Sequence, residues 1–312
     1  MDGVLVVDKP QGPTSHDVVA AARRALFGAQ RGSVPRQPRV GHTGTLDPLA
    51  TGVLPLACGR ATRLVRFLIG SDKDYDATIA FGFTTDTCDI TGIETSRTDR
   101  RPDPEAVQRA LESLTGRYLQ TPPAYSAKKV GGERAYDLAR RDEKIELTPV
   151  EVAVTRATLT AFDGRVASVS LTCSAGFYVR SFAQSLGERV GTGACLESLR
   201  RTRSGQFTLT NAVSLAEVIE SPSLAVQRMV PLDELLPSLP AVRLSHEERT
   251  RVAHGRPLQK PEDRDSPGQG GGVVTSSDGQ AWVRLLDVEG HLVALATRGN
   301  EPGSLHPAVV LI

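Results

Sequence analysis

Aromatic side chains, cysteines and long apolar runs are all scarce in this sequence of 312 residues. Phe, Tyr and Trp make up 4% of it, with a single Trp. The four cysteines form no C-x-x-C pair, which argues against a zinc knuckle or a disulfide framework and favours buried thiols in a reducing compartment. No apolar run reaches the roughly 18–20 residues of a membrane span, and the N-terminus lacks the features of a secretory signal. These absences predict a cytoplasmic protein that does not enter a membrane.

Net charge is small as well, +1 over the chain, but the charges are segregated. Residues 1–70 carry nine Lys/Arg against four Asp/Glu, whereas residues 71–120 carry six against ten. Residues 121–180 are slightly basic, and residues 241–312 carry eight basic against nine acidic side chains. A basic N-terminal third permits a polyanionic ligand, although charged stretches are most often solvated surface. The chain length suggests two domains.

Apolar periodicity predicts strands and helices that are intermixed along the chain. Strands are predicted at residues 3–7, 52–58, 75–81, 150–161 and 166–173. Helices are predicted at residues 15–26, 61–68, 102–114, 136–139 and 179–190, and a further helical stretch precedes a linker at 231–240. Polar loops are predicted at residues 28–39 and 260–272. Because strands and helices do not alternate regularly, the predicted fold class is α+β rather than a doubly wound sheet.

The densest motif is GHTGTLDPLATGVLPL at residues 41–56, where one carboxylate, Asp47, lies among glycines just before a buried strand. An Asp in a turn usually bonds its own backbone. Reactive groups, however, commonly lie on rigid loops of this kind. The residues alone leave Asp47 as either a turn residue or a catalytic acid.

Together with GVLVVDKPQGPTSHDVV at residues 3–19, this motif resembles the TruB-type tRNA pseudouridine synthases, which act on uridine 55 in the T-loop of tRNA. Further matching motifs follow in order: SDKDY (71–75), TTDT (84–87), PPAYSAKK (122–129), CSAGFYVR (173–180), GACL (193–196) and LRR (199–201). The resemblance is continuous from residue 3 to about residue 215. It implies a pseudouridine synthase catalytic domain at residues 1–239, with a mixed or antiparallel sheet flanked by helices. It also implies a thumb-like insertion at about 120–148 and a PUA-like, β-rich RNA-binding domain at 240–312.

The resemblance assigns the chemistry to three residues. Pseudouridine forms when the N1–C1′ bond breaks, the uracil rotates and the base rejoins through C5, so no cofactor is implied. Asp47 matches the catalytic aspartate, which can act as a nucleophile or abstract a proton, with attack on C6 and on C1′ both open. Arg180 matches the arginine that pairs with this aspartate and favours its ionised form. Tyr75 matches the ring that stacks on the target base and takes part in proton transfer, although cross-strand packing would explain a lone Tyr in a strand.

The resemblance also implies substrate contacts. The target uridine lies inside the folded T-loop and must be extruded, at a cost of a few kcal/mol. His42 matches the residue that fills the vacated space, and Tyr178 and Leu199 match residues that line the uracil pocket. Lys9 belongs to the family's Asp-Lys-Pro motif, with a role that is structural or close to a phosphate.

The thumb-like insertion has a charge pattern of its own. Lys128 and Lys129 stand among Arg and Tyr side chains, which suits phosphate contacts and base stacking. No metal is expected, because no second His or Cys lies at ligand spacing from His42, and nothing local supports a Cys/His nucleophilic pair. The predicted partner is the T-arm of tRNA, bound by a monomer with no obligate protein partner. Two alternatives remain open: an RNA chaperone that refolds tRNA in the same cleft, and a guide-dependent synthase.

Overall fold

The computed structural model describes residues 1–28, 38–126, 128–130, 133–134, 136, 138, 141, 147–259, 281–299 and 303–312, with the backbone alone at 129, 130 and 134. Its main feature is an 11-stranded sheet whose central path runs β14-β1-β3-β12-β4-β11-β10-β7. In that order the strands are Val213–Ser214, Gly3–Lys9, Thr51–Cys58, Ala194–Ser204, Lys73–Phe81, Val166–Cys173, Val150–Phe162 and Gly116–Gln120. The strands β2 (Val40–His42), β13 (Phe207–Thr208) and β15 (Val230–Pro231) pair with β3, β12 and β1.

The sheet is mixed, and its two halves meet at a narrow junction. β1–β14 and β3–β12 are parallel, and the remaining pairs are antiparallel. β12 pairs with β3 only at Arg200–Thr51 and Arg201–Gly52. The loop that joins β2 to β3 therefore lies next to the half of the sheet that contains β12 and β4.

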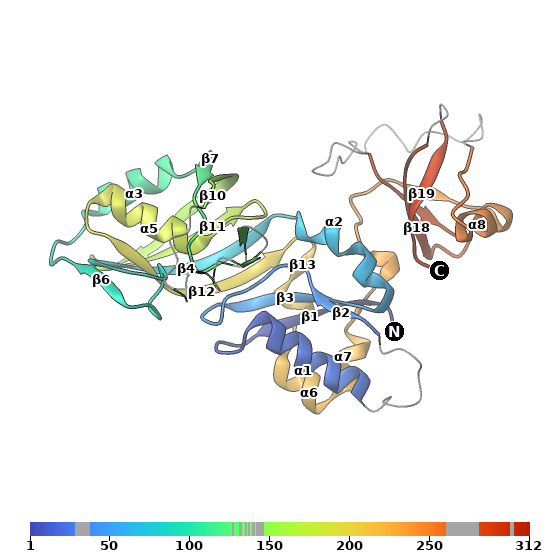
Figure 1. Cartoon of the computed structure of the whole chain (residues 1–312), viewed down its shortest axis with the longest axis horizontal. Helices are drawn as coiled ribbons and strands as arrows, with labels where there is room; N and C mark the ends of the chain where they lie inside the picture. The colour runs from blue at the N-terminus through green and yellow to red at the C-terminus, as the bar shows by residue number, and fades with distance from the viewer. Residues whose placement is uncertain are drawn as a thin grey trace.

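Helices flank each half of the sheet (Figure 1). α1 (Ser15–Phe27), α6 (Leu215–Glu220) and α7 (Pro222–Gln227) lie by β1, and α3 (Pro104–Ser113) and α5 (Val179–Val190) lie by β10 and β12. α1 begins at a capping box of Thr14 and Asp17 and buries the apolar face that its periodicity predicted. The α+β class and the mixed sheet flanked by helices are confirmed. None of the helices in the described parts of the chain is both long and apolar enough to span a bilayer.

Some elements differ from the sequence prediction. β7 and the long strand β12 were not predicted, and the helix expected at 61–68 is a 3-10 segment, η2 (Gly59–Leu64), followed by α2 (Val65–Ile69). β12 escapes pattern analysis because most of its residues from Glu197 to Ser204 are polar or charged, although Arg201 and Ser204 are buried. Burial of a polar strand depends on its neighbours in the sheet, and the strand's own sequence does not encode them.

A second sheet of four strands begins at Ala241. Its order is β16 (Ala241–Arg243), β17 (Val283–Leu286), β18 (Leu292–Arg298) and β19 (Leu305–Val310), with α8 (His246–Ala253) packed on it. This region is thus rich in β-strands, with one helix, α8, in its described part. The predicted linker at 231–240 is a packed connection and not a free spacer: β15 pairs with β1, η4 covers Leu232–Glu234, and Leu235 and Leu239 are buried.

The two sheets share one apolar cluster. It joins side chains of β1, β3 and α2 to side chains of the second sheet: Val4, Val6, Val53, Leu68, Trp282, Leu292, Leu295, Val309 and Leu311. Trp282 packs edge-on against Phe67 of α2 at 4.7 Å between ring centroids. Arg60 Nη1 donates to the Leu311 carbonyl at 2.6 Å. The second sheet therefore packs beside η2 and α2, and η2 in turn contacts β1 and β3.

We expect Trp282→Ala to lower the free energy of unfolding by about 3–5 kcal/mol, as truncation of a large core aromatic does. Trp282 is 4% exposed and stands at the shared cluster. Calorimetry or denaturation followed by circular dichroism measures the loss. Ile69→Ala, at a residue of α2 that is 44% exposed, is the control and should change stability by about 0.5 kcal/mol or less. Equal losses in the two variants would contradict a shared core.

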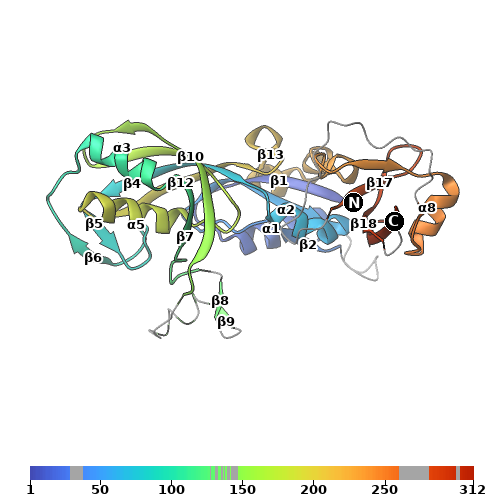
Figure 2. The same cartoon turned by 90° about the horizontal axis from the view of Figure 1, so that it is seen from above.

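Outside these sheets, β5 (Phe83–Thr85) pairs with β6 (Glu94–Arg97), and β8 (Lys129–Val130) pairs with β9 (Glu133–Arg134). β8 and β9 fall in the region predicted as a thumb-like insertion, and they stand off the ends of β7 and β10 (Figure 2). The helix predicted at 136–139 falls largely outside the described residues. The loops predicted at 28–39 and 260–272 do so for the most part.

Candidate active site

The loop between β2 and β3 is fixed by hydrogen bonds from the start of α1 and by burial of its own apolar side chains. Ser15, at the start of α1, donates its hydroxyl to the Leu46 carbonyl at 2.9 Å and accepts from the Leu46 amide at 2.8 Å. The Gly12 amide donates to Pro48, and the Ala50 amide donates back to the Asp47 carbonyl. Leu46, Leu49 and Ala50 are buried. These contacts fix the backbone on both sides of Asp47.

Lys9 lies beneath the same loop with no exposed surface. Its ammonium group donates to the carbonyls of Ala50 at 2.7 Å, Pro10 at 2.9 Å and Pro48 at 3.4 Å. Burial lowers the pKa of Lys9 to about 8, and the nearby Asp47 carboxylate opposes that shift. Of the two roles predicted for Lys9, this geometry supports the structural one over phosphate contact.

Asp47 forms an ion pair with Arg180. Arg180 Nε lies 2.8 Å from Asp47 Oδ2, and the arginine side chain is 7% exposed while that of Asp47 is 40% exposed. The two remaining guanidinium nitrogens donate to the carbonyls of Tyr125 at 2.8 Å and Thr87 at 3.2 Å. Asp89, also buried, lies 3.8 Å from Arg180 Nε. Arg180 is thus oriented on all sides, and it presents one edge to a carboxylate that solvent or a ligand can reach.

The start of α5 is also fixed. Gln120, at the end of β7, donates to the Tyr178 carbonyl at 3.0 Å and accepts from the Tyr178 amide at 2.9 Å. The Ser181 hydroxyl donates to the Thr121 carbonyl at 2.9 Å. These bonds hold Tyr178 and Arg180 against the edge of the sheet that β7 forms.

A small hollow opens beside the ion pair. Its empty volume is about 160 Å³ and its lining consists of Asp47, Leu49, Ala50, Asp89, Arg180, Leu196 and Leu199. This volume includes space that is open to solvent, so the hollow is a shallow depression in the surface beside Asp47. Apolar walls with one ion pair favour a flat, partly polar group placed against a charged carboxylate.

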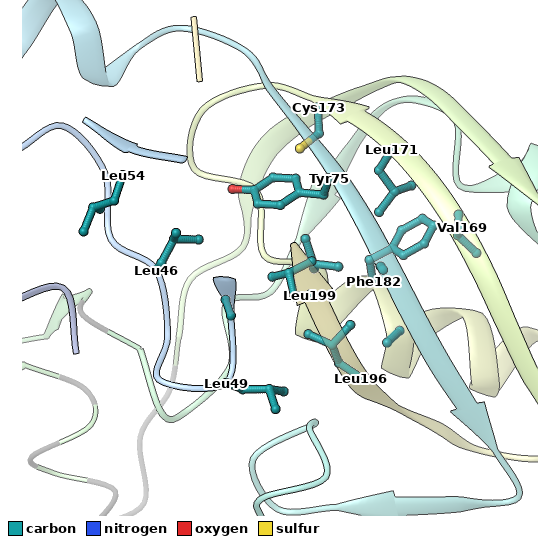
Figure 3. Packing of buried hydrophobic residues seen from close by; sticks show 14 of the residues in the cluster. Leu46, Leu49, Leu54, Tyr75, Val169, Leu171, Cys173, Phe182, Leu196 and Leu199 are labelled. Carbon is teal, nitrogen blue, oxygen red and sulfur yellow. The ribbon is translucent and has the colours of Figure 1, made fainter. Parts of the chain in front are cut away.

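Tyr75 of β4 lies in the same apolar surroundings and is 6% exposed. Its ring packs near Cys173 and Leu199, with the hydroxyl end directed toward the side of Leu46 and Leu54 (Figure 3). Burial raises the pKa of the Tyr75 hydroxyl, and the neighbouring Arg201 guanidinium opposes that rise. The phenol is therefore protonated at neutral pH.

The other predicted residues lie farther from the hollow. His42 is half-buried at the start of the loop, with its ring edge-on to His16 at 5.5 Å, and burial lowers its pKa. Lys128 donates to the Thr148 carbonyl at 2.8 Å, and Lys129 lies in β8. The structure thus brings Asp47, Arg180 and Leu199 together at the hollow, with Tyr75 packed against Leu199. It leaves His42, Lys9, Lys128 and Lys129 outside the lining, and Tyr178 just before Arg180.

Four further residues of the site were not predicted: Ser15, Asp89, Gln120 and Arg201. Asp89 and Gln120 act at the site only through tertiary contacts, and no local pattern marks them. Arg201 is the last residue of the LRR motif, and Ser15 follows the helix cap Thr14. Their places within these motifs could have marked both as candidate site residues. Among the described residues, the metal-ligand side chains that cluster are Asp287, Glu289 and His291, at the turn between β17 and β18 and away from Asp47.

Gly52 sets how closely β3 approaches β12 behind the site. Its φ is +99°, and a Cβ would lie 2.2 Å from the Arg201 carbonyl oxygen. We expect Gly52→Ala to cost about 4 kcal/mol or more in unfolding free energy, because the strands must separate. Gly12→Ala is the matched control, with φ +109° and open space around it, and should cost only the roughly 1–2 kcal/mol of backbone strain. Similar unfolding midpoints for the two variants would contradict the close approach.

The fold of the whole chain matches solved structures of H/ACA ribonucleoproteins. An archaeal box H/ACA sRNP complex matches with a TM-score of 0.68 and 22% identity, over 99% of this chain and 86% of that chain. An H/ACA RNP bound to a substrate RNA containing 2′-deoxyuridine matches with a TM-score of 0.68 and 21% identity, over 99% and 85%. The chain therefore has the pseudouridine synthase fold.

Sequence comparison identifies the family to which the chain belongs within this fold. The model of the TruB family pseudouridylate synthase N-terminal domain matches residues 31–179, and that of the tRNA pseudouridylate synthase B C-terminal domain matches residues 180–239. Two proteins named tRNA pseudouridine synthase B are similar over nearly all of both chains. The one from Solibacter usitatus is 40% identical over 100% of each chain, and the one from Thermobifida fusca is 42% identical over 99% of this chain and 98% of its own. This chain belongs to the TruB family of pseudouridylate synthases, as its motifs predicted.

Proposed function

We propose that this protein is a stand-alone tRNA pseudouridine synthase that isomerises uridine 55 in the T-loop. The observation that supports this proposal most strongly is the ion pair of Asp47 and Arg180, which lies beside a small hollow lined by Leu49, Leu196 and Leu199. Membership of the TruB family and relatives named tRNA pseudouridine synthase B support the choice of tRNA as substrate.

The reaction breaks the N1–C1′ and C5–H bonds and forms the C5–C1′ and N1–H bonds, with the C5 proton lost to water and a proton taken up at N1, so it is an isomerisation with no net redox change. Asp47 attacks the nucleoside and divides one difficult step into two easier ones. Its Oδ2 is held by Arg180, which leaves Oδ1 as the attacking oxygen. Arg180 holds the carboxylate aligned, and Leu196 and Leu199 exclude water from the reacting ring.

The Tyr75 ring stacks on the extruded uracil, and its hydroxyl takes part in proton transfer. Tyr75→Phe should therefore keep affinity for T-arm RNA but lose most turnover, about 10²-fold or more. Tyr75→Leu should weaken binding too, because stacking on a base is worth about 1–3 kcal/mol. Tyr118→Phe is the control, since burial raises the pKa of Tyr118 to about 12 but this residue of β7 does not line the hollow. Equal turnover in Tyr75→Phe and wild type would leave Tyr75 a stacking role only.

RNA contacts extend beyond the hollow in this proposal. His42 fills the space that the extruded base leaves, and Lys128 and Lys129 of the thumb-like insertion contact phosphates. Residues 1–239 form the catalytic domain and residues 240–312 form a PUA-like RNA-binding domain. The protein works as a cytoplasmic monomer.

The purified protein alone, given a T-arm stem-loop of about seventeen nucleotides labelled with tritium at C5 of uridine, tests this function. Isomerisation replaces the C5–H bond, so turnover releases tritium into water. A stem-loop with cytidine at the target position is the control and should release none. A protein that is inert alone and active only with an added guide RNA would favour the guide-dependent alternative.

A further inference from the structure

Arg201 is a fully buried cation at the junction between the two halves of the main sheet. Its side chain is 1% exposed. In β12 it stands opposite Gly52 of β3 on one side and opposite Tyr75 of β4 on the other. One residue therefore touches the strand that follows the Asp47 loop and the strand that carries Tyr75.

Its guanidinium group bonds to backbone carbonyls at both ends of that loop. Nε donates to Val53 at 2.7 Å, Nη2 donates to Gly44 at 3.1 Å and Nη1 donates to Thr45 at 3.4 Å. Within the described parts of the chain, no carboxylate lies within ion-pair distance of it. An unpaired buried charge is costly unless hydrogen bonds compensate it, so these carbonyls are what keeps the cation in place. The planar fork of Arg suits several carbonyls at once, whereas the single ammonium of Lys does not.

The neighbouring arginines of β12 are held differently. Arg200 pairs with Asp8 at 2.7 Å, and Arg203 pairs with Asp74 at 2.7 Å. Both are partly exposed, at 40% and 32% of their side chains. Arg201 alone among the three is directed into the site without a carboxylate partner, and its charge acts on the Tyr75 hydroxyl.

We propose that Arg201 is a positioning residue, which clamps the Gly44–Val53 loop and thereby sets Asp47 relative to Tyr75. The inference rests on the roles proposed above for those two residues. Without the clamp, the loop loses the bonds at both of its ends but keeps those of Lys9 and Ser15. The loop should remain folded, but the Asp47 carboxylate should no longer be held in its reactive position relative to Tyr75. Displacements near 1 Å can cost about 10²-fold in rate.

Two readouts test the clamp, in Arg201→Lys and Arg201→Gln, with Arg200→Lys as the matched control on the same strand. Amide hydrogen exchange over residues 43–50, measured on the full chain without RNA, should accelerate at least tenfold in Arg201→Gln and less in Arg201→Lys. Single-turnover isomerisation of the T-arm should fall about 10²-fold in Arg201→Gln, while the dissociation constant for that RNA stays within about threefold. Arg200→Lys should change neither measurement.

Unchanged loop exchange in both Arg201 variants would overturn the clamp, whatever the wild-type activity. A loss of RNA affinity that matches the loss of rate would overturn the positioning role. Should Arg201→Gln fail to fold, Arg201→Lys decides, because a rate within threefold of wild type would also overturn the inference. If the wild type leaves the T-arm unmodified while loop exchange responds to Arg201, the proposed function fails and the clamp stands.

Discussion

Asp47→Asn is expected to abolish pseudouridine formation, with a loss of about 10³-fold or more in the single-turnover rate, because an amide oxygen is a poor nucleophile. The substitution keeps the size of the side chain and leaves the backbone contacts of the loop in place. Affinity for T-arm RNA should therefore change little. Tritium release and RNA binding, measured on the same preparations, give the two numbers.

Asp76→Asn is the matched control for this prediction. Asp76 follows Tyr75 in β4, but its side chain is exposed on the opposite face of the strand. We expect wild-type turnover from it. An Asp47→Asn rate within about tenfold of wild type would remove Asp47 as the nucleophile. The same variant bears on the chaperone alternative, because refolding of tRNA should survive in Asp47→Asn if the protein has that activity.

The second large effect is expected for Arg180→Lys, at about 10²-fold or more in rate with RNA binding retained. Arg180 meets Asp47, Thr87 and Tyr125 with separate nitrogens of one rigid plane. A lysine keeps the charge, but its point-like ammonium cannot hold the three partners at once. The carboxylate would then lose its alignment in a site where small displacements are costly.

Arg189→Lys provides the control, since Arg189 is exposed in the last turn of the same helix. Both variants should unfold within a few degrees of the wild type if α5 stays intact. Full activity in Arg180→Lys would show that charge alone suffices, and that the fork of hydrogen bonds described here is not needed for the reaction.

Elements with regular apolar spacing were predictable, and polar elements were not. α5 was predicted at its observed bounds because Phe182 and Leu186 recur at helical spacing and Gly191 ends the helix. β10 and β11 were predicted at residues 150–161 and 166–173, within one residue of their observed bounds. β12 was missed because its arginines resemble a solvated stretch, yet it lies at the centre of the sheet. Its burial depends on strands far away in the sequence.

In the candidate site too, local motifs were predictable from the sequence and tertiary contacts were not. Asp47, Arg180, Tyr75 and Leu199 were predicted from motifs, whereas the placement of Asp47, Arg180 and Leu199 around one hollow, with Tyr75 packed against Leu199, depends on the fold. The ammonium of Lys9 could not be placed from sequence, because a Lys before a Pro-rich turn is usually exposed. Only the structure shows it turned under the loop. The bonds from Gln120 to Tyr178 likewise join distant segments, which no local pattern predicts.

The most direct test of the account is to map pseudouridine in a full-length tRNA transcript after incubation with the purified protein alone. We expect close to one pseudouridine per tRNA, at position 55, and none in a transcript that carries cytidine there. Asp47→Asn should leave both transcripts unmodified. Absence of pseudouridine with the wild type, or its formation mainly at other positions, would contradict the account.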